Sequence, residues 1–272
     1  MLAAVAFAVF AQPAAAETYK FGVVPQQAAK LLARAWGPVF RYLSARTGDQ
    51  YVFATAPNIP EFEKRLAAGE YAVAYMNPYH YTVFGERPGY VALAKAKLKK
   101  IRGIVIVRKD SGITDIAQLD GTTLAFPAPA AFAASVLPRS EFTKAGVGFT
   151  PKYVSSHDSV YRSVYKGFYP AGGGVVRTFN NLDSRVRDEL RILWKTDGYT
   201  PHAIATHPDV APDVRSRLLS ELEKMDGNDA GKALLERLKV KGFEHAAHAD
   251  WDDVRALNID LIKRVAKAET KL

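Results

Sequence analysis

Residues Gly167–Phe179 read GFYPAGGGVVRTF, and they parallel an earlier stretch, Gly69–Pro78, which reads GEYAVAYMNP. Each stretch follows a helix-like run and passes through a short apolar segment to small or turn-forming residues. A helix, a glycine, a short apolar strand and a turn make half of an α/β sheet unit, and ligands bind at the strand ends of such sheets. Two separated copies therefore predict two lobes.

Apolar periodicity extends this pattern along most of the chain. The run Tyr19–Val24 ends at Pro25 and predicts a buried strand. Apolar residues then recur every three or four positions from 31 to 43, which predicts a helix closed by Gly48. Further strands are predicted at 51–54, 71–75, 102–108, 123–126, 153–154 and 191–194, and further helices at 59–68, 78–84, 131–145, 159–166, 214–225, 230–238 and 251–268. Strands that alternate with helices imply mainly parallel sheets with right-handed crossovers.

Composition narrows the classes of function. The 272 residues are 48% hydrophobic, which is enough for one large core or two modest ones. There is no cysteine, so structural disulfides, thiolate chemistry and a lipid anchor on an N-terminal cysteine are excluded. The net charge of +9 favours anionic partners. Basic runs such as Lys95–Lys100 are not interleaved with aromatic residues, so we do not expect nucleic-acid binding.

The start of the chain predicts export. Residues 1–16 carry no charge and end in the small-residue run Ala14–Ala16, which is typical of a signal peptide cleaved before Glu17. The segment lacks the Lys or Arg that normally opens a signal peptide, and the alternative is an apolar first helix of the folded protein. We expect a soluble monomer in the periplasm, with no membrane insertion after cleavage.

Several blocks in a fixed order carry a resemblance to a known family. They are Phe21–Pro25 (FGVVP), Trp36–Pro38 (WGP), Gly69–Pro78, Arg102–Ile113 (RGIVIVRKDSGI), Ser156–Asp158 (SHD) and Leu193–Thr196 (LWKT). In these blocks the chain resembles the type II periplasmic solute-binding proteins, and in particular the phosphate/phosphite/phosphonate-binding subfamily that serves ABC transporters. The resemblance covers nearly the whole chain after residue 16.

The resemblance implies an α/β fold of two lobes, each a mainly parallel sheet flanked by helices, with the ligand cleft between the lobes. It divides the chain into a signal peptide (1–16), a first part of lobe one (17–105), lobe two (106–202) and a return segment of lobe one (203–272). The strand at 102–108 and the segment at 201–207 are then the crossings at which hinge motion closes the cleft.

The resembled subfamily holds its ligand at a helix N-terminus that carries Ser-Thr-Ser-Gly, where unpaired backbone N–H groups attract an oxyanion. The matching segment here is Ala128–Pro138, in which Ala131, Phe132 and Ala133 replace the three hydroxyl residues. Each hydrogen bond to a charged group contributes about 1.5–3 kcal/mol, so their loss removes about 4 kcal/mol or more, roughly a thousandfold in affinity. We therefore expect phosphate and methylphosphonate to bind poorly.

Two departures from the family pattern concern the chemistry of the ligand. Phe132 shrinks the polar cavity or stacks on an organic ligand, unless its ring turns into the core of lobe two. Pro170 stands where the family usually has an aspartate, whose carboxylate can accept a proton still held by the ligand. The loss of the three hydroxyls and the loss of this acid both indicate a ligand other than a protonated phosphorus oxyanion, and drift in a degenerate copy is the alternative.

Polar candidates for the site occur in both lobes. His157 matches a family histidine at a helix start, with a structural role as the alternative. Arg177 is suited to clamp a carboxylate, with surface solvation as the alternative. In lobe one, Asn77 and Tyr79 are the preferred polar pair beside Met76. The predicted ligand-binding set is Met76, Asn77, Tyr79, Ala131, Phe132, Ala133, His157 and Arg177.

No catalytic or cofactor motif competes with ligand binding. The glycines at 172–174 lack the spacing of a dinucleotide fingerprint, no nucleophile motif is present, and the histidines and aspartates at 245–252 match no metal motif. We expect no enzyme activity, no cofactor and no bound metal. The predicted role is delivery of a small anionic ligand to an ABC permease, with a periplasmic sensing subunit for a receptor kinase as the alternative.

Overall fold

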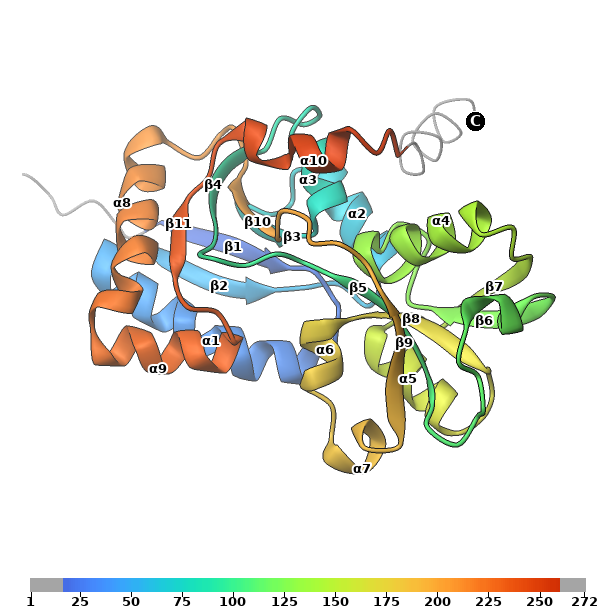
Figure 1. Cartoon of the computed structure of the whole chain (residues 1–272). Helices are drawn as coiled ribbons and strands as arrows, with labels where there is room; N and C mark the ends of the chain where they lie inside the picture. The colour runs from blue at the N-terminus through green and yellow to red at the C-terminus, as the bar shows by residue number, and fades with distance from the viewer. Residues whose placement is uncertain (1–16, 260–272) are drawn as a thin grey trace, which may run out of the picture.

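The computed structural model describes residues 17–259, which fold into two α/β lobes (Figure 1). The first part of lobe one contains β1 (Thr18–Val23), α1 (Ala29–Thr47), β2 (Gln50–Ala54), α2 (Ile59–Ala67), β3 (Val73–Met76), α3 (Pro78–Phe84) and β4 (Val91–Ala96). Its return part contains β10 (Ala203–Thr206), α8 (Pro212–Glu223), η3 (Lys224–Gly227), α9 (Asp229–Leu238), β11 (Phe243–His245), η4 (His248–Trp251) and α10 (Asp252–Arg255). The predicted signal peptide and residues 260–268 of the helix predicted at 251–268 lie outside the described residues. Within the described residues that prediction is wrong, because α10 ends at Arg255 and a turn follows it.

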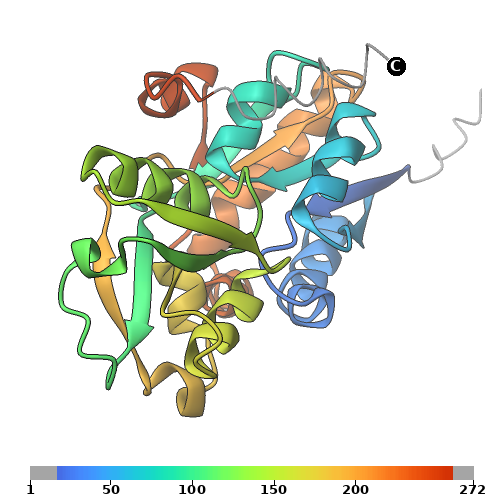
Figure 2. The same cartoon turned by 90° about the vertical axis from the view of Figure 1, so that its right-hand side faces the viewer.

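Lobe two is a continuous insertion between the two parts of lobe one. It contains β5 (Gly103–Arg108), η1 (Ile116–Leu119), β6 (Thr122–Phe126), η2 (Phe132–Val136), α4 (Leu137–Lys144), β7 (Phe149–Tyr153), α5 (His157–Tyr165), β8 (Ala171–Val175), α6 (Val176–Asn180), α7 (Ser184–Arg187) and β9 (Leu190–Lys195). Figure 2 shows helices on both sides of its sheet, α4 on one side and α5 on the other.

Each lobe is built on one mixed sheet. The strand order is β11-β4-β10-β3-β1-β2 in lobe one and β7-β6-β8-β5-β9 in lobe two. The predicted parallel core is present as β3-β1-β2 and as β7-β6-β8. The strands next to the passages between the lobes pair antiparallel. A chain that returns from the other lobe enters the sheet at the end where the parallel strands finish, so its strand runs antiparallel to them. Each passage between the lobes therefore adds antiparallel pairs to the parallel core.

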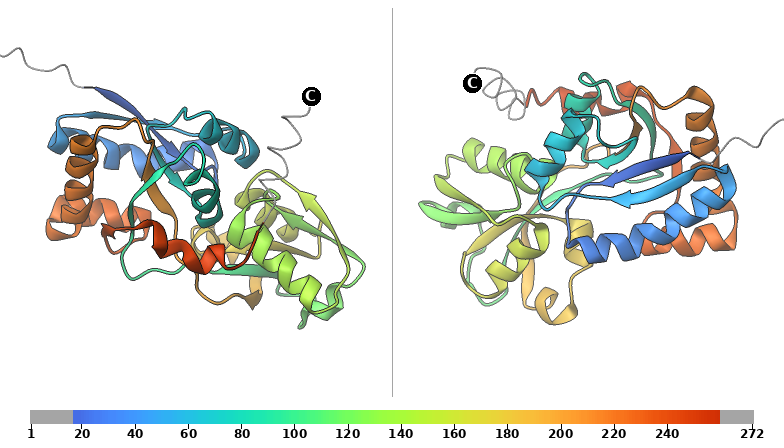
Figure 3. Two further views of the ribbon diagram at one scale, coloured as in Figure 1. Left: turned by 90° about the horizontal axis from the view of Figure 1, so that it is seen from above. Right: turned by 180° about the vertical axis from the view of Figure 1, so that it is seen from behind.

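The helices bury the faces that the periodicity predicts. In α1, Trp36 and Phe40 pack on Phe21 of β1, with ring centroids 6.0 and 4.5 Å from the Phe21 ring. Gly48 ends this helix in the left-handed conformation, with φ of 80°, which glycine adopts without strain. Figure 3 shows α1 and α9 side by side on the same side of the lobe-one sheet. Among residues 17–259, no helix has the length and apolar character needed to cross a membrane.

The glycine run Gly172–Gly174 is explained by close packing on both faces of β8. Side chains at the outer two glycines would lie 2.4 Å from Val160 and from Tyr161 on α5. A side chain at Gly173 would lie 1.9 Å from the carbonyl oxygen of Ala134 on the opposite face. Helix and turn therefore approach the strand so closely that no Cβ atom fits at any of the three positions.

Two crossings join the lobes, and they pair with each other. They run through residues 97–102 and 196–202, because β4 and β10 belong to the lobe-one sheet and β5 and β9 to the lobe-two sheet. The N–H of Ile101 donates to the carbonyl of Tyr199 at 2.8 Å, and the N–H of Tyr199 donates back at 3.0 Å. Strand β5, which we expected to cross between the lobes, lies wholly in the lobe-two sheet, and the limit predicted at residue 105 falls inside it.

Candidate functional site

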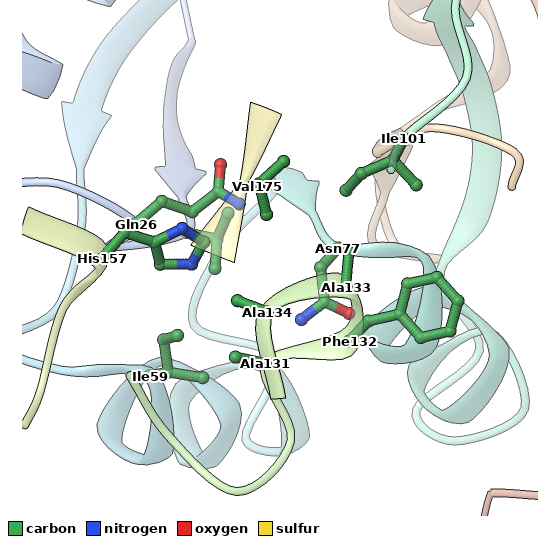
Figure 4. Close-up of a pocket in the computed structure, with 11 residues that line it drawn as sticks. Gln26, Ile59, Asn77, Ile101, Ala131, Phe132, Ala133, Ala134, His157 and Val175 are labelled. Carbon is green, nitrogen blue, oxygen red and sulfur yellow. The ribbon is translucent and has the colours of Figure 1, made fainter. Parts of the chain in front are cut away.

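A small cavity lies between the lobes beside the first crossing (Figure 4). Its volume is about 10 Å³, which is room for about one water molecule. Lobe one, the first crossing and lobe two all contribute to the wall, which is formed by Val24, Gln26, Ile59, Asn77, Ile101, Ala131, Phe132, Ala133, Ala134, His157 and Val175. Most of these side chains are apolar, so the few polar groups decide which solute fits.

One wall of the cavity is a π-helical turn. η2 continues directly into α4, so the helix predicted at 131–145 begins with a π turn. The turn lies directly on two strands because Gly103 and Gly173 lack side chains, and a Cβ on either would meet a carbonyl oxygen of the turn at 2.1 or 1.9 Å. Such turns are frequent at functional sites.

This turn presents backbone N–H groups rather than hydroxyls. Within residues 17–259, the N–H groups of Phe132, Ala133 and Ala134 have no backbone acceptor. The next N–H, that of Ser135, donates to the carbonyl of Ala131 at 2.7 Å. Unpaired N–H groups at a helix start carry partial positive charge and attract oxyanions. The turn therefore offers unpaired N–H donors to the cavity although the hydroxyls typical of the resembled subfamily are absent.

The ring of Phe132 packs between the lobes. It is buried and lies edge-on to Tyr199 of the second crossing, with ring centroids 5.5 Å apart. Ala128, residues 130–134 and Leu137 belong to the same apolar cluster as the core of lobe one, and not to either cluster of lobe two. The alternative in which Phe132 enters the lobe-two core is therefore wrong.

His157 is held as a neutral imidazole at the cavity wall. It is the first residue of α5, which Ser156 caps by accepting from the N–H of Ser159. Its Nδ1 lies 3.0 Å from the hydroxyl of Thr178. Burial, and to a smaller degree the positive charge of Arg177, lowers the pKa of His157 to about 3. The group therefore offers the cavity a neutral ring.

Gln26 links the lobes beside His157. It lies three residues after the end of β1 and is buried. Its side-chain Oε1 accepts from Nη2 of Arg177 on α6 of lobe two, and its backbone carbonyl accepts from the N–H of His157 at 3.2 Å. Arg177 itself does not line the cavity. Gln26 is absent from the set predicted from the sequence, although the loop after the carboxyl end of a parallel strand is a usual place for ligand contacts.

Of the three candidates in lobe one, only Asn77 lines the cavity. Asn77 lines the cavity and caps α3, accepting from the N–H of His80 at 2.8 Å, while its Nδ2 donates across the cleft to the carbonyl of Ala130 at 3.3 Å. Met76 is buried in the lobe-one core and does not line the cavity. Tyr79 lines a different groove, between α3 and the end of the described chain.

Pro170 has no place at the cavity. It is exposed and precedes β8, whereas the cavity residue Val175 ends the same strand. A strand of five residues spans about 16 Å, so the two ends are well separated. The interpretation of Pro170 as a lost acid of the cleft is therefore wrong. No group of histidine, aspartate and glutamate side chains within residues 17–259 could hold a metal ion.

A comparison with protein families decides the identity. The family described as "ABC transporter, phosphonate, periplasmic substrate-binding protein" matches residues 21–251. The chain belongs to this family. Membership in this phosphonate-binding family implies a small-molecule ligand and an ABC permease as partners, as the sequence resemblance predicted.

Relatives of the phosphonate-binding family agree in sequence and fold. The phosphate-import protein PhnD of Mycolicibacterium smegmatis is 23% identical over 265 residues, which cover 88% of this chain and 78% of that protein. PhnD1 from Prochlorococcus marinus, solved in complex with methylphosphonate, has a TM-score of 0.83 at 16% identity and covers 90% of this chain and 98% of its own. A binding component of an ABC phosphonate transporter from Pseudomonas aeruginosa has a TM-score of 0.82 at 16% identity, covering 89% and 86%. The predicted two-lobe fold is thereby confirmed.

Proposed function

We propose that this chain is the periplasmic solute-binding component of an ABC importer and that its altered, less polar site captures a small organic anion. The observation that carries the proposal is the cavity between the lobes, where apolar side chains surround the N–H groups of residues 132–134. Neutral donors in a largely apolar wall suit a solute with one anionic group and an apolar portion.

The cavity also limits how the solute is bound. A volume of about 10 Å³ is far below the roughly 300–1,000 Å³ of ordinary ligand pockets, so the lobes move apart to admit a solute. The hydrogen bonds of Gln26 to Arg177 and of Asn77 to Ala130 join the lobes in this closed arrangement. We infer that the protein binds and releases its solute without chemical change, in the manner of a carrier.

Phosphorus oxyanions are the first solutes to compare, because phosphate is named for one relative and methylphosphonate for another. Calorimetry on protein that starts at Glu17 should show dissociation constants for both well above those for acetate or propionate. Restoring hydroxyls with Ala131→Ser, Phe132→Thr and Ala133→Ser should tighten phosphate binding by roughly a thousandfold. Submicromolar phosphate binding by the parent would refute the proposed specificity. Mass spectrometry of the co-purified solute tests it independently.

Export and oligomeric state belong to the same proposal. We propose that residues 1–16 are removed, and that the protein acts as a monomer in the periplasm. Fractionation of native cells, with N-terminal sequencing and light scattering, tests each point. Retention of residues 1–16 on a cytoplasmic protein would contradict it.

A further inference from the structure

We propose that Gln26 is a specificity-determining residue whose amide N–H groups contact the solute, and that Arg177 is a positioning residue that acts through Gln26. The inference rests on the proposed function and names the class of solute more closely. It replaces the direct arginine clamp suggested by the sequence.

Arg177 fixes the orientation of the Gln26 carboxamide. Arg177 offers only donors and stays protonated, so the atom of Gln26 that faces Nη2 must be the acceptor Oε1. The amide nitrogen then points the other way. Figure 4 shows this nitrogen directed toward the side on which Val175 lies, and both residues line the cavity. Within residues 17–259, the hydrogen bonds of Gln26 use its Oε1 and its backbone groups and leave Nε2 for another acceptor, and the residue is only 5% exposed.

The other polar side chains of the cavity wall already form hydrogen bonds within the protein. Asn77 uses its oxygen for the N–H of His80 and its nitrogen for the carbonyl of Ala130. Nδ1 of His157 is paired with Thr178. Three kinds of donor therefore remain in the cavity wall. They are the N–H groups of the π turn, the second ring nitrogen of His157 and the amide nitrogen of Gln26.

The uncharged groups of the cavity wall limit the charge of the solute. The guanidinium of Arg177 is paired with Gln26 and does not line the cavity, and His157 is neutral, so the contacts with the solute come from uncharged groups. Uncharged donors compensate the desolvation of one negative charge better than that of two, because the cost of removing an ion from water rises steeply with its charge. The site therefore fits a singly charged oxyanion, such as a carboxylate.

Contact between Gln26 and the solute depends on the lobes being together. Gln26 belongs to lobe one, and the two residues that donate to its oxygens, Arg177 and His157, belong to lobe two. The carboxamide is therefore oriented only when the lobes meet. A solute that contacts Gln26 therefore favours a form in which the lobes still meet around it, because this contact is lost when they separate fully.

Calorimetry with propionate, which has one charge, and sulfate, which has two, tests the donor role. Gln26→Met should weaken propionate binding by about 10- to 150-fold, the range for a hydrogen bond to a charged group. Gln26→Glu keeps a partner for Arg177 but places an anion at the cavity, so it should weaken propionate by more than about 100-fold. Gln50→Glu on the exposed start of β2 makes the same charge change and should leave the affinity unchanged. The parent should bind propionate more tightly than sulfate.

A double-variant cycle tests the positioning role of Arg177. Arg177→Ala should weaken propionate binding in the parent but add less than about threefold in the Gln26→Met background. Arg177→Lys, which keeps a donor for Oε1, should retain most of the affinity. A further loss of about tenfold or more in the Gln26→Met background would show a direct clamp and overturn this role.

The outcomes separate the two proposals. Equal propionate binding by the parent and Gln26→Glu overturns the donor role and leaves the proposed function in place. Tighter binding of sulfate than of propionate overturns the assignment to singly charged oxyanions. Failure of the parent to bind any of these anions, phosphate and methylphosphonate included, overturns the proposed function and the donor role with it. Thermal melting of each variant confirms that it is folded.

Discussion

Gly173→Ala should be among the most damaging single-methyl changes in this protein. The added Cβ would lie 1.9 Å from the carbonyl oxygen of Ala134 and 2.8 Å from a ring carbon of Phe126. Ordinary contact begins at 3.4 Å, so the π turn and β8 would have to separate by about 1.5 Å. The obstacle on the turn is backbone, which cannot rotate aside as a side chain does.

The expected magnitude follows from known costs of overpacking. Overfilling a packed core costs about 1–3 kcal/mol, and a backbone clash places this case at the upper end. Alanine also restricts the unfolded chain and returns about 0.4–1 kcal/mol. A net loss of about 2 kcal/mol lowers the melting temperature of a chain of this size by about 4–8 °C. Because the turn carries the N–H groups that we propose bind the anion, propionate affinity should fall as well.

Gly227→Ala is the matched control. It makes the same substitution where no atom lies within 4 Å of the new Cβ and the backbone is not left-handed. Thermal and urea unfolding of both variants should show a large loss for Gly173→Ala and little change for Gly227→Ala. Equal midpoints for the two variants would refute the close packing of the turn on β8.

Two further predictions concern pH and lobe contact. Burial lowers the pKa of His157 to about 3 and that of His202 well below its usual 6.5. Below about pH 6.5 the unfolded chain therefore binds protons at these two imidazoles that the folded protein does not bind. The free energy of unfolding should therefore hold steady above about pH 6.5 and fall below it by up to about 1.4 kcal/mol per pH unit for each imidazole. Urea titrations across pH should show a shallower fall for His157→Gln, and an unchanged slope would contradict the assignment. Asn77→Ala and Asn58→Ala both remove a helix cap and should cost about 0.5–2 kcal/mol each. Only Asn77→Ala also loses the bond to Ala130, so small-angle scattering should show more open lobes for that variant alone.

The fold could be predicted because its signals are local. The apolar run of β1, the periodicity of α1 and the glycine that ends it all act within one element and its immediate flanks. The antiparallel strands could not be predicted in the same way, because strand direction in a sheet depends on where the chain re-enters a lobe. Strand β5 illustrates this limit, since its β-branched run predicts a strand but does not say which sheet it joins.

The site was predicted in part for a similar reason. Ala131–Ala133, Asn77 and His157 line the cavity because each occurs at a strand end or helix start, where sequence signals are strong. Pro170 was placed at the wrong end of β8, although only the carboxyl end of that strand reaches the cleft. Gln26 was missed because its role depends on Arg177, a residue 151 positions away in sequence. Contacts of this kind become visible only when the two lobes are seen together.

The apolar cluster that runs from lobe one into residues 128–137 bears on how fast a solute is captured. Separating the lobes would expose these side chains to water, so the open form that admits a solute would be a minority of the population. Apparent affinity is reduced by the fraction of molecules able to bind, and association waits for that fraction to form. In a rapid-mixing experiment the observed binding rate should then level off as solute concentration rises, at the rate with which the lobes separate.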